Sequence, residues 1–273
     1  MVAEPVIWLN GQFIPRHIAG IPPDDRGVLL GDGLFETMLI KSGIVQHASL
    51  HLARLQDGAT RLGISIPYAA EAILKACHAV AQLNNLGSAA LRLTLTRGTG
   101  PRGLGPIPAP APNLWISAFP IVPILPTVTA IICTITRRNE FSPLSTMKTL
   151  NYLDNIIARG EAEAEGADDA ILLNTQGFVA AATTANIFVR HAGAWLTPRR
   201  QDGALPGIFR ARLLAAGILR EARLSVDDLH ASDGVCLGNT LGVRIVTSLN
   251  TQRLRQNAAA VAALRFCHEA VDE

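Results

Sequence analysis

The chain has 273 residues, of which 49% are hydrophobic and 17% are charged, and its formal net charge is +2. At roughly 150 residues per domain, this length predicts one or two domains. The hydrophobic fraction is large enough to form a core without disulfides or a structural metal, and it excludes an intrinsically disordered chain. The small net charge gives no reason to expect a nucleic-acid-binding surface.

Charge is missing altogether from one stretch of the chain. Residues 103–136 contain no Lys, Arg, Asp or Glu, and residues 114–136 are largely apolar. A transmembrane helix is disfavoured because Pro120, Pro123 and Pro126 each remove a backbone donor and block helix continuation. Val, Ile, Thr and Trp on either side favour strands. We therefore predict buried strands at 114–119 and 128–136, a proline-stiffened connector between them, and no membrane contact.

The first residues and the cysteines indicate a cytoplasmic protein. Glu4, and the lack of a basic segment before a long apolar run, argue against a signal peptide. Cys77, Cys133, Cys236 and Cys267 are far apart and form no CxxC pair. Free thiols are therefore expected, and a metal cluster is not.

The other predicted elements alternate between helices and strands along the chain. Hydrophobic residues at helical spacing predict helices over 50–62, 68–83, 152–165 and 207–216. Short apolar runs predict strands over 6–9, 44–46, 90–96, 169–173, 178–182, 186–190, 194–197, 234–237 and 244–249. This mixture predicts an α/β (α+β) fold. Half of the sixteen prolines lie between Pro101 and Pro126, which predicts a small N-terminal α/β domain (1–119), a connector (120–126) and a larger C-terminal domain (127–273).

Lys148 is the first candidate for chemistry. The chain has only three lysines and takes most of its positive charge from arginine. Lysine has the one side-chain amine that can form a Schiff base with a carbonyl compound or act as a base when desolvated. Taken alone, Lys148 is more typical of an ordinary exposed lysine.

Two turns have the composition of phosphate-binding sites. The segment LPGIFR (205–210) opens an apolar helix with proline and glycine, and the N–H groups at a helix N-terminus attract phosphate. The segment GNTLG (238–242) places small polar residues between two strands. A plain turn is the alternative interpretation of each.

Two arginines are candidates for binding an anionic group. Arg54 is expected on the outer side of its helix, where a bidentate grip on phosphate or carboxylate is possible. Arg97 opens the segment RGTGPRG (97–103), whose glycines would let a ligand approach closely. A solvated arginine is the alternative for both, and His51 is more typical of helix packing than of ligand binding.

Together, these motifs resemble the fold-type IV pyridoxal-phosphate enzymes. That family contains branched-chain and D-amino-acid aminotransferases and 4-amino-4-deoxychorismate lyases. The resemblance covers about residues 10–249 and is carried, in the family's order, by DRG (25–27), GDGLFET (31–37), HLARL (51–55), KTLNYL (148–153), NIF (186–188), TP (197–198), LPGI (205–208) and NT (239–240). It implies a two-domain enzyme whose larger domain has a β-barrel-like core. It also implies the cofactor pyridoxal 5'-phosphate, a small-molecule amino substrate and a homodimer.

The resemblance also implies roles for individual residues. Lys148 would form the Schiff base with the cofactor and then transfer the substrate proton. Tyr152 would bond the phenolic oxygen of the cofactor. The cofactor phosphate would be held by Arg54, the backbone N–H groups of Ile208 and Phe209, and Thr240.

One position departs from the family's pattern. The family's stretch G-x-x-x-E-x-x-x-x-N-x-F is GFVAAATTANIF here (177–188), so Ala181 stands where a glutamate keeps the pyridine nitrogen protonated. That proton makes the ring a strong electron sink. Asp168 and Asp169 precede the strand and Gln176 lies in the turn, so no carboxylate next to Ala181 in sequence replaces the glutamate.

Three functions are compatible with this departure. A 4-amino-4-deoxychorismate lyase is expected first, because aromatisation drives its reaction and RGTGPRG looks like the lyases' stretch. In that reading Arg97 grips a substrate carboxylate, and Thr37 and Thr149 assist near the ring. A class IV aminotransferase acting on D- or branched-chain amino acids is the second. A pyridoxal-phosphate-binding homologue with little turnover is the third.

Overall fold

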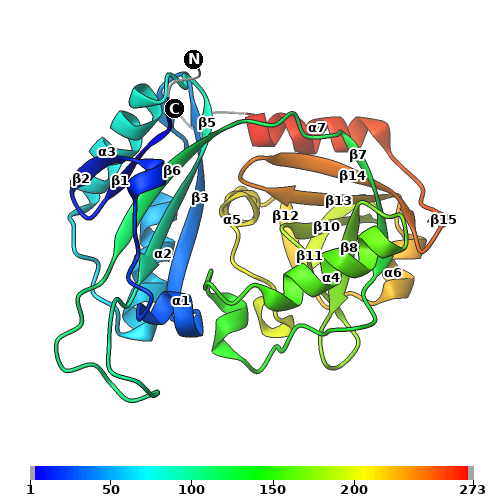
Figure 1. Ribbon diagram of the computed structural model, residues 1–273. Helices are drawn as coiled ribbons and strands as arrows, with labels where there is room; N and C mark the ends of the chain where they lie inside the picture. The colour runs from blue at the N-terminus through cyan, green and yellow to red at the C-terminus, as the bar shows by residue number, and fades with distance from the viewer. Residues whose placement is uncertain (1–3, 270–273) are drawn as a thin grey trace. The chain divides into compact units, whose positions relative to one another are not determined.

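The computed structural model describes residues 4–269, which divide into two compact units (Figure 1). Unit 1 contains the described residues up to Val122 together with Lys148–Asn151, and unit 2 contains Pro123–Met147 and the described residues from Tyr152 onward. The linear division predicted from the prolines does not anticipate the return of Lys148–Asn151 to unit 1. This return matters because it carries the candidate catalytic lysine.

Unit 1 is built on a six-stranded antiparallel sheet with the strand order β2-β1-β6-β5-β3-β4. Its strands are β1 (Val6–Leu9), β2 (Gln12–Pro15), β3 (Gly33–Lys41), β4 (Ile44–Val45), β5 (Ala89–Thr96) and β6 (Leu114–Pro120). Its helices are η1 (Arg16–Ile18), α1 (Arg26–Leu30), α2 (Ala48–Leu62) and α3 (Ala70–Leu83).

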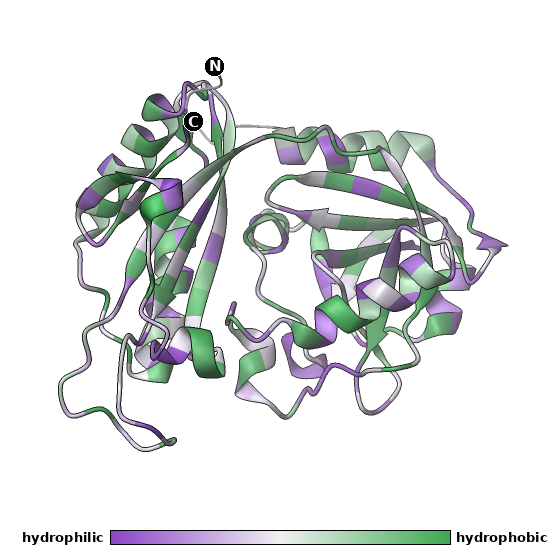
Figure 2. Ribbon diagram, in the orientation of Figure 1, coloured by the Kyte–Doolittle hydropathy of each residue, from purple (hydrophilic) through white to green (hydrophobic). Residues whose placement is uncertain are grey.

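Helices α2 and α3 cover one face of this sheet (Figure 1). Their purple and green bands in Figure 2 reflect the spacing of apolar residues that predicts both helices. Gly58 of α2 lies against Leu34 of β3, where an added Cβ would be 3.0 Å from a Leu34 methyl carbon. Successive residues of a strand point to opposite faces, so β3 directs Leu34, Glu36 and Met38 towards the helices.

Unit 2 is built on a nine-stranded mixed sheet with the order β12-β11-β10-β13-β14-β7-β8-β9, while β15 pairs with β14 off this path. Its strands are β7 (Thr127–Ile132), β8 (Asp169–Leu173), β9 (Val179–Ala182), β10 (Asn186–His191), β11 (Ala194–Pro198), β12 (Leu219–Ala222), β13 (Gly234–Asn239), β14 (Gly242–Leu249) and β15 (Gln252–Arg253). Its helices are η2 (Pro143–Thr146), α4 (Leu153–Ala164), η3 (Arg200–Asp202), α5 (Ile208–Ala215), α6 (Val226–Ala231) and α7 (Ala258–Glu269).

The sheet of unit 2 curls, as the predicted barrel-like core requires. The end strand β9 contacts β10 and β11 in the other half of the sheet, and the N–H of Val179 donates to the carbonyl of Leu224 (2.8 Å). The curled sheet encloses an aliphatic core that includes Ile171, Ile187 and Val246. The predicted mixed α/β fold is therefore confirmed.

The uncharged stretch forms β6, a loop over 121–126 and β7. Within residues 4–269, no helix is long and apolar enough to cross a membrane. The predicted strand over 128–136 ends earlier, at Ile132. The N–H of Cys133 still donates to the carbonyl of Ile171 in β8 (2.9 Å), but Thr134 and Ile135 bond to a side chain instead of to a neighbouring strand. The carboxylate of Glu161 accepts the N–H groups of Thr134 (3.0 Å) and Ile135 (3.4 Å), and Arg137 donates to the carbonyl of Cys133 (2.6 Å).

Candidate active site

Lys148 lies on a short segment that pairs with β3 in unit 1. The N–H of Phe35 donates to the carbonyl of Lys148 (2.9 Å), and the N–H of Leu150 donates to the carbonyl of Gly33 (3.0 Å). The Nζ of Lys148 lies 4.3 Å from the centroid of the Phe35 ring. The backbone of the lysine is therefore held along β3, and its amine is placed against an aromatic face.

Arg92 brings a second cation to the same ring. Its Cζ lies 3.9 Å from the centroid of Phe35. Arg92 pairs with Thr37 in the β3–β5 ladder, so these two side chains share a sheet face with Phe35, which is two residues from Thr37. The sequence reasoning missed Arg92, because an arginine within the run ALRLTLT is typical of an ordinary strand. Only the register of β3 and β5 places Arg92 against the Phe35 ring, which Lys148 also contacts.

Thr37 and Thr149 lie on either side of this arrangement. Thr37 is half-buried on the face that carries Phe35 and Arg92, and Thr149 is buried where it bridges to Leu34. Their assistance in the reaction stays a prediction.

Glu36, His51 and Arg54 form a buried network between β3 and α2. Arg54 donates from Nε and Nη2 to the two carboxylate oxygens of Glu36 (2.7 and 2.6 Å), and His51 Nδ1 lies 2.7 Å from the same carboxylate. The expectation that Arg54 occupies the outer side of its helix is wrong. Its side chain is only 11% exposed, because β3 directs Glu36 towards α2. His51 is fully buried and packs within the unit, as predicted.

The electrostatics of this network favour an ionised Glu36. Burial raises the pKa of Glu36, but the charge of Arg54 and the hydrogen bond with His51 outweigh burial and hold the pKa below its ordinary value. Burial lowers the pKa of His51 more strongly than Glu36 raises it. The structure therefore fixes the Arg54 guanidinium in one orientation, while its contact with the cofactor phosphate stays a prediction.

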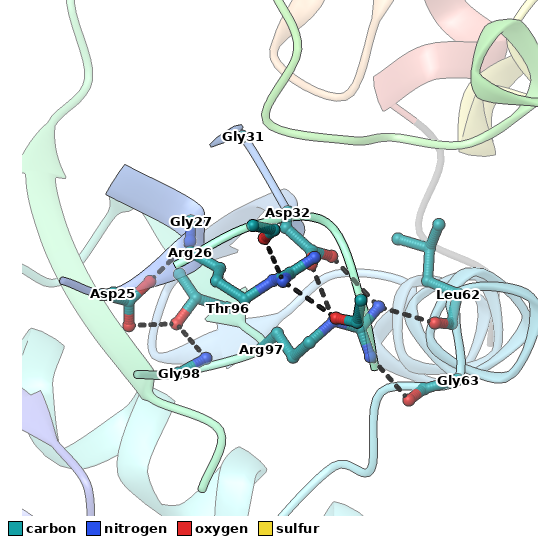
Figure 3. A network of polar contacts seen from close by, with 12 residues as sticks. Asp25, Arg26, Gly27, Gly31, Asp32, Leu62, Gly63, Thr96, Arg97 and Gly98 are labelled. Atoms are coloured by element: carbon teal, nitrogen blue, oxygen red, sulfur yellow. Dashed lines mark hydrogen bonds and ion pairs between the residues drawn. The ribbon is translucent and has the colours of Figure 1, made fainter. Parts of the chain in front are cut away.

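Arg97 is held by several partners within unit 1 (Figure 3). Its Nε and Nη2 donate to Asp32 (2.7 and 3.1 Å), and its Nη2 and Nη1 donate to the carbonyls of Leu62 (2.7 Å) and Gly63 (2.9 Å). Burial raises the pKa of Asp32, but the hydrogen bonds from Arg97 and Arg26 outweigh burial and lower it. These contacts tie the end of β5 to the end of α2, so a substrate carboxylate would have to displace Asp32 to reach Arg97.

The DRG motif at 25–27 is part of the same polar network (Figure 3). Asp25 is fully buried and accepts hydrogen bonds from the N–H of Gly27 (2.6 Å), the hydroxyl of Thr96 (2.7 Å) and the amide of Asn113 (2.6 Å). Asp25 therefore caps α1 and ties it to β5 and to the segment before β6.

In unit 2, the N-terminus of α5 has the geometry of an anion site. Its N-cap is Gly207, and no side chain caps it. The first N–H groups of a helix, here those of Ile208 and Phe209, have no partner within the helix and attract anions. An added Cβ at Gly207 would lie 2.0 Å from Oδ1 of Asn186, whose Nδ2 donates to the carbonyl of Leu205 (2.9 Å). Any side chain at position 207 would therefore disturb the start of the helix.

The second predicted phosphate turn lies beside this helix. The Phe209 ring packs against Gly238, where an added Cβ would be 3.2 Å from the ring, and it lies edge-on to Phe188 (centroids 5.6 Å apart). Gly238 directly precedes Asn239 and Thr240 in the β13–β14 hairpin. The structure thus brings together the two turns that the sequence indicates separately, and the contact of Thr240 with the cofactor phosphate stays a prediction.

Tyr152 lies at the N-cap of α4, also in unit 2. It interacts electrostatically with Arg138. The Arg138 Nε donates to the carbonyl of Gly203 (3.1 Å), and its Nη2 donates to the carbonyl of Ser145 (2.7 Å). Arg138, which the sequence reasoning also missed, therefore places a fixed positive charge near Tyr152.

Ala181 lies in the edge strand β9 and is 7% exposed. The neighbouring carboxylates that could replace the family's glutamate are engaged elsewhere. Asp169 accepts from the hydroxyl of Thr183 (2.6 Å) and from Arg244 (2.6 Å), and Asp168 accepts from the N–H of Thr129 (2.8 Å). The structure therefore supplies no replacement carboxylate from these two residues.

Comparisons with known proteins show the family to which the chain belongs. The family model for class IV aminotransferases matches residues 33–249. A Methanocaldococcus jannaschii protein, provisionally named a branched-chain-amino-acid aminotransferase, is 34% identical over 86% of this chain and 84% of its own length. The D-alanine aminotransferase of Bacillus licheniformis is 26% identical over 92% of this chain and 91% of its own length. A crystal structure from Legionella pneumophila, provisionally named a 4-amino-4-deoxychorismate lyase, superimposes with a TM-score of 0.85 at 32% identity and covers 92% of this chain and 95% of that one.

The chain belongs to the class IV aminotransferase family and is a fold-type IV pyridoxal-phosphate-dependent enzyme. The residues of unit 2 fit the phosphate of this cofactor, because the uncapped start of α5 offers backbone donors beside the Asn239–Thr240 turn. In unit 1, Lys148 has the side-chain amine that a Schiff base with this cofactor would need.

Proposed function

We propose that the protein is an aminotransferase that moves the amino group of a small amino acid, branched-chain or D-configured, to a 2-oxo acid. The observation that carries the proposal is the placement of the Lys148 amine and the Arg92 guanidinium against one Phe35 ring. An amine beside a second cation suits a substrate that presents both an amino group and a carboxylate. The named relatives favour this function over the lyase that the sequence predicts first.

The residues would divide the work as follows. The N–H groups of Ile208 and Phe209, with Thr240, hold the cofactor phosphate, and Tyr152 binds its phenolic oxygen. When bound, pyridoxal phosphate supplies an electron-accepting ring. Lys148 attaches the cofactor covalently and moves the substrate proton.

In unit 1, the proposal assigns the other polar residues to substrate and support. Arg92 binds the substrate carboxylate, and Thr37 and Thr149 contribute hydroxyls. Arg97 holds the end of β5 in place through its hydrogen bonds to Asp32. We assign the substrate carboxylate to Arg92 in preference to Arg97.

We also propose that the protein is a cytoplasmic homodimer. Leu153, Ile156 and Ile157 lie at positions i, i+3 and i+4 of α4 and are exposed. An apolar stripe of this kind supports a subunit interface. Light scattering should give the mass of a dimer, and Ile156→Lys should lower that mass towards a monomer.

The test of the function is a half-reaction. Purified holoenzyme is mixed separately with L-leucine, L-valine, L-glutamate and D-alanine, and the cofactor spectrum is followed. Conversion to the pyridoxamine form with one of these, reversed by a 2-oxo acid, is expected. Borohydride reduction followed by mass spectrometry should place the cofactor on the Lys148 peptide, and Lys148→Arg should abolish that label. No conversion with any amino acid would refute the proposal.

The lyase stays the second candidate because of Ala181. A reaction driven by aromatisation is harmed less by a weak electron sink than transamination is, and position 181 provides no carboxylate. Release of 4-aminobenzoate and pyruvate from aminodeoxychorismate, without formation of the pyridoxamine form, would favour the lyase.

A further inference from the structure

Asn155 on α4 carries a buried polar atom that the proposed function leaves unexplained. The residue is 7% exposed, and its Nδ2 donates to the carbonyl of Thr183 (2.7 Å). Its Oδ1 is fully buried and has no hydrogen-bond partner among residues 4–269. An unsatisfied buried acceptor costs about 1–3 kcal/mol, so Oδ1 is expected to meet a donor that the chain itself does not supply.

Asn155 lies over the sheet face that carries Ala181. Ala158 and Ala162 of α4 pack against Leu172 of β8, and Asn155 precedes Ala158 by three residues on the same side of the helix. Leu172 is the cross-strand partner of Ala181, and cross-strand partners share a face.

The contact of Asn155 with Thr183 places its amide two residues from Ala181 along the chain. Ala181 ends at Cβ, so a polar group for this region must come from a neighbouring element.

The aspartates around this region already accept hydrogen bonds from other residues of the chain. Asp169 accepts at Oδ1 from Thr183 and at Oδ2 from Arg244, and Asp168 accepts from Thr129. Asp154, next to Asn155 on α4, is exposed and accepts from the hydroxyl of a threonine in the loop after β7 (2.7 Å). Within residues 4–269, Oδ1 of Asn155 is thus a buried acceptor on this face that no hydrogen bond of the chain satisfies.

The position of Asn155 on α4 also suits the cofactor. Tyr152, proposed to bind the phenolic oxygen, is the N-cap of α4 and precedes Asn155 by three residues, about one helical turn. In pyridoxal phosphate the phenolic carbon and the ring nitrogen are two ring positions apart. The first turn of α4 with its N-cap can therefore serve both groups.

We propose, on the basis of the proposed function, that Oδ1 of Asn155 accepts the hydrogen bond of the pyridine N–H, in place of the carboxylate that Ala181 lacks. Because Nδ2 is held by the Thr183 carbonyl, the amide presents its oxygen and not its NH₂ group. A neutral oxygen stabilises the protonated ring less than a carboxylate does. The enzyme thus works with a weakened electron sink whose strength Asn155 sets.

The test follows the ring nitrogen directly. Enzyme loaded with ¹⁵N-labelled pyridoxal phosphate is titrated with acid and base, and the ¹⁵N chemical shift gives the pKa of the ring nitrogen. Asn155→Asp should raise this pKa by about one to three pH units, the usual effect of a charge partner. Asn155→Leu, which removes the acceptor, should lower it. Ala181→Glu should raise the pKa of the ring nitrogen, and the size of this shift shows how much a carboxylate at the family's position contributes.

The matched control is Asn257→Asp. Asn257 caps α7 through Oδ1, which accepts from Ala260 (3.1 Å), and aspartate caps equally well, so the variant adds the same charge away from this face. It should leave the nitrogen pKa unchanged. If Asn155→Asp does not fold, the Leu variant decides the test alone.

Failure of the inference is distinguishable from failure of the proposed function. Borohydride labelling at Lys148, with unchanged nitrogen pKa values in both Asn155 variants, would overturn the role of Asn155 and leave the enzyme assignment intact. A shift with Ala181→Glu alone would equally overturn it. Absence of the Lys148 label in the wild-type protein would refute the proposed function itself.

Discussion

Replacement of the Glu36 carboxylate should destabilise unit 1 more than any surface charge change does. Glu36 is 1% exposed and is bonded by Arg54 and His51 at 2.6–2.7 Å. The variant Glu36→Gln keeps the size of the side chain but leaves the guanidinium of Arg54, 11% exposed, without its counter-charge. Removal of one partner from a buried ion pair costs about 3–5 kcal/mol. This loss is a large fraction of the roughly 5–15 kcal/mol that stabilises a domain.

A matched control is available on α4. Arg159 and Glu163 form an exposed i,i+4 pair, with 43% and 65% of their side chains exposed. Glu163→Gln should therefore change the free energy of unfolding by only about 0.3–0.5 kcal/mol. A double variant, Glu36→Met with Arg54→Met, should recover most of the lost stability, because it leaves no charge buried alone.

The assay is urea unfolding of the three variants, followed by tryptophan fluorescence, with the slope m required to stay constant. The pH dependence has a definite sign. The pKa of Glu36 is lowered in the folded state, so its contribution is complete above the ordinary value of 4.5 and is lost as the pH falls below it. The difference between wild type and Glu36→Gln should therefore shrink in acid. Equal unfolding midpoints for Glu36→Gln and Glu163→Gln at neutral pH would refute the reasoning.

Three further predictions concern other parts of the chain. Gly207→Ala should weaken pyridoxal-phosphate binding about tenfold or more in a fluorescence titration, whereas Gly160→Ala, where an added Cβ meets nothing within 4 Å, should leave it unchanged. Arg97→Lys should lower the free energy of unfolding by about 1–3 kcal/mol through loss of the bidentate bond to Asp32; unchanged stability would point to a substrate role alone. Burial raises the pKa of Glu161, but hydrogen bonds outweigh burial and lower it to about 2, so its stabilisation is complete above pH 4.5 and is lost as the pH falls towards 2. Urea midpoints of Glu161→Gln should lack this part of the acid dependence, and a wild-type pH profile in the variant would contradict the assignment.

Most of the regular elements could be predicted from the sequence because their signals are local. The strand over 169–173 appears with the predicted bounds, as β8. The helix over 68–83 begins two residues later than predicted, at Ala70. By contrast, the nine-residue strand β3 was missed, although its motif GDGLFET was singled out. Nearly all residues of β3 are buried or half-buried, and they include the charged Glu36, which lies in an ion network on the inner face. A buried charge breaks the alternation of apolar and polar residues by which a half-buried strand is recognised.

The candidate site also contains some residues that the sequence could predict and others that it could not. The phosphate turns could be chosen from the sequence because glycine at a helix start has a local meaning, and the structure places LPGIFR beside GNTLG. Arg92 could not be predicted as a site residue, because its place beside the same ring as Lys148 depends on two pairings of β3. One pairing is with β5, and the other is with the segment Lys148–Asn151. Asn155 could not be chosen either, because an asparagine on a helix is unremarkable until its Oδ1 is found buried without a partner.

Arg92 and Asn155, which the sequence analysis missed, bear on whether the enzyme is an aminotransferase or a lyase. The motifs indicate the cofactor and predict its covalent anchor, which aminotransferases and lyases share, so they cannot separate the two reactions. Separation depends on how strongly the ring draws electrons and on where the substrate carboxylate lies. Ala181 lacks the carboxylate of the family's pattern, and Asn155 and Arg92, which come from elements distant in sequence, are the polar groups that we propose for the cofactor ring and the substrate carboxylate. A single position that departs from a motif is therefore a poor guide to activity until the side chains that the fold brings beside it are known.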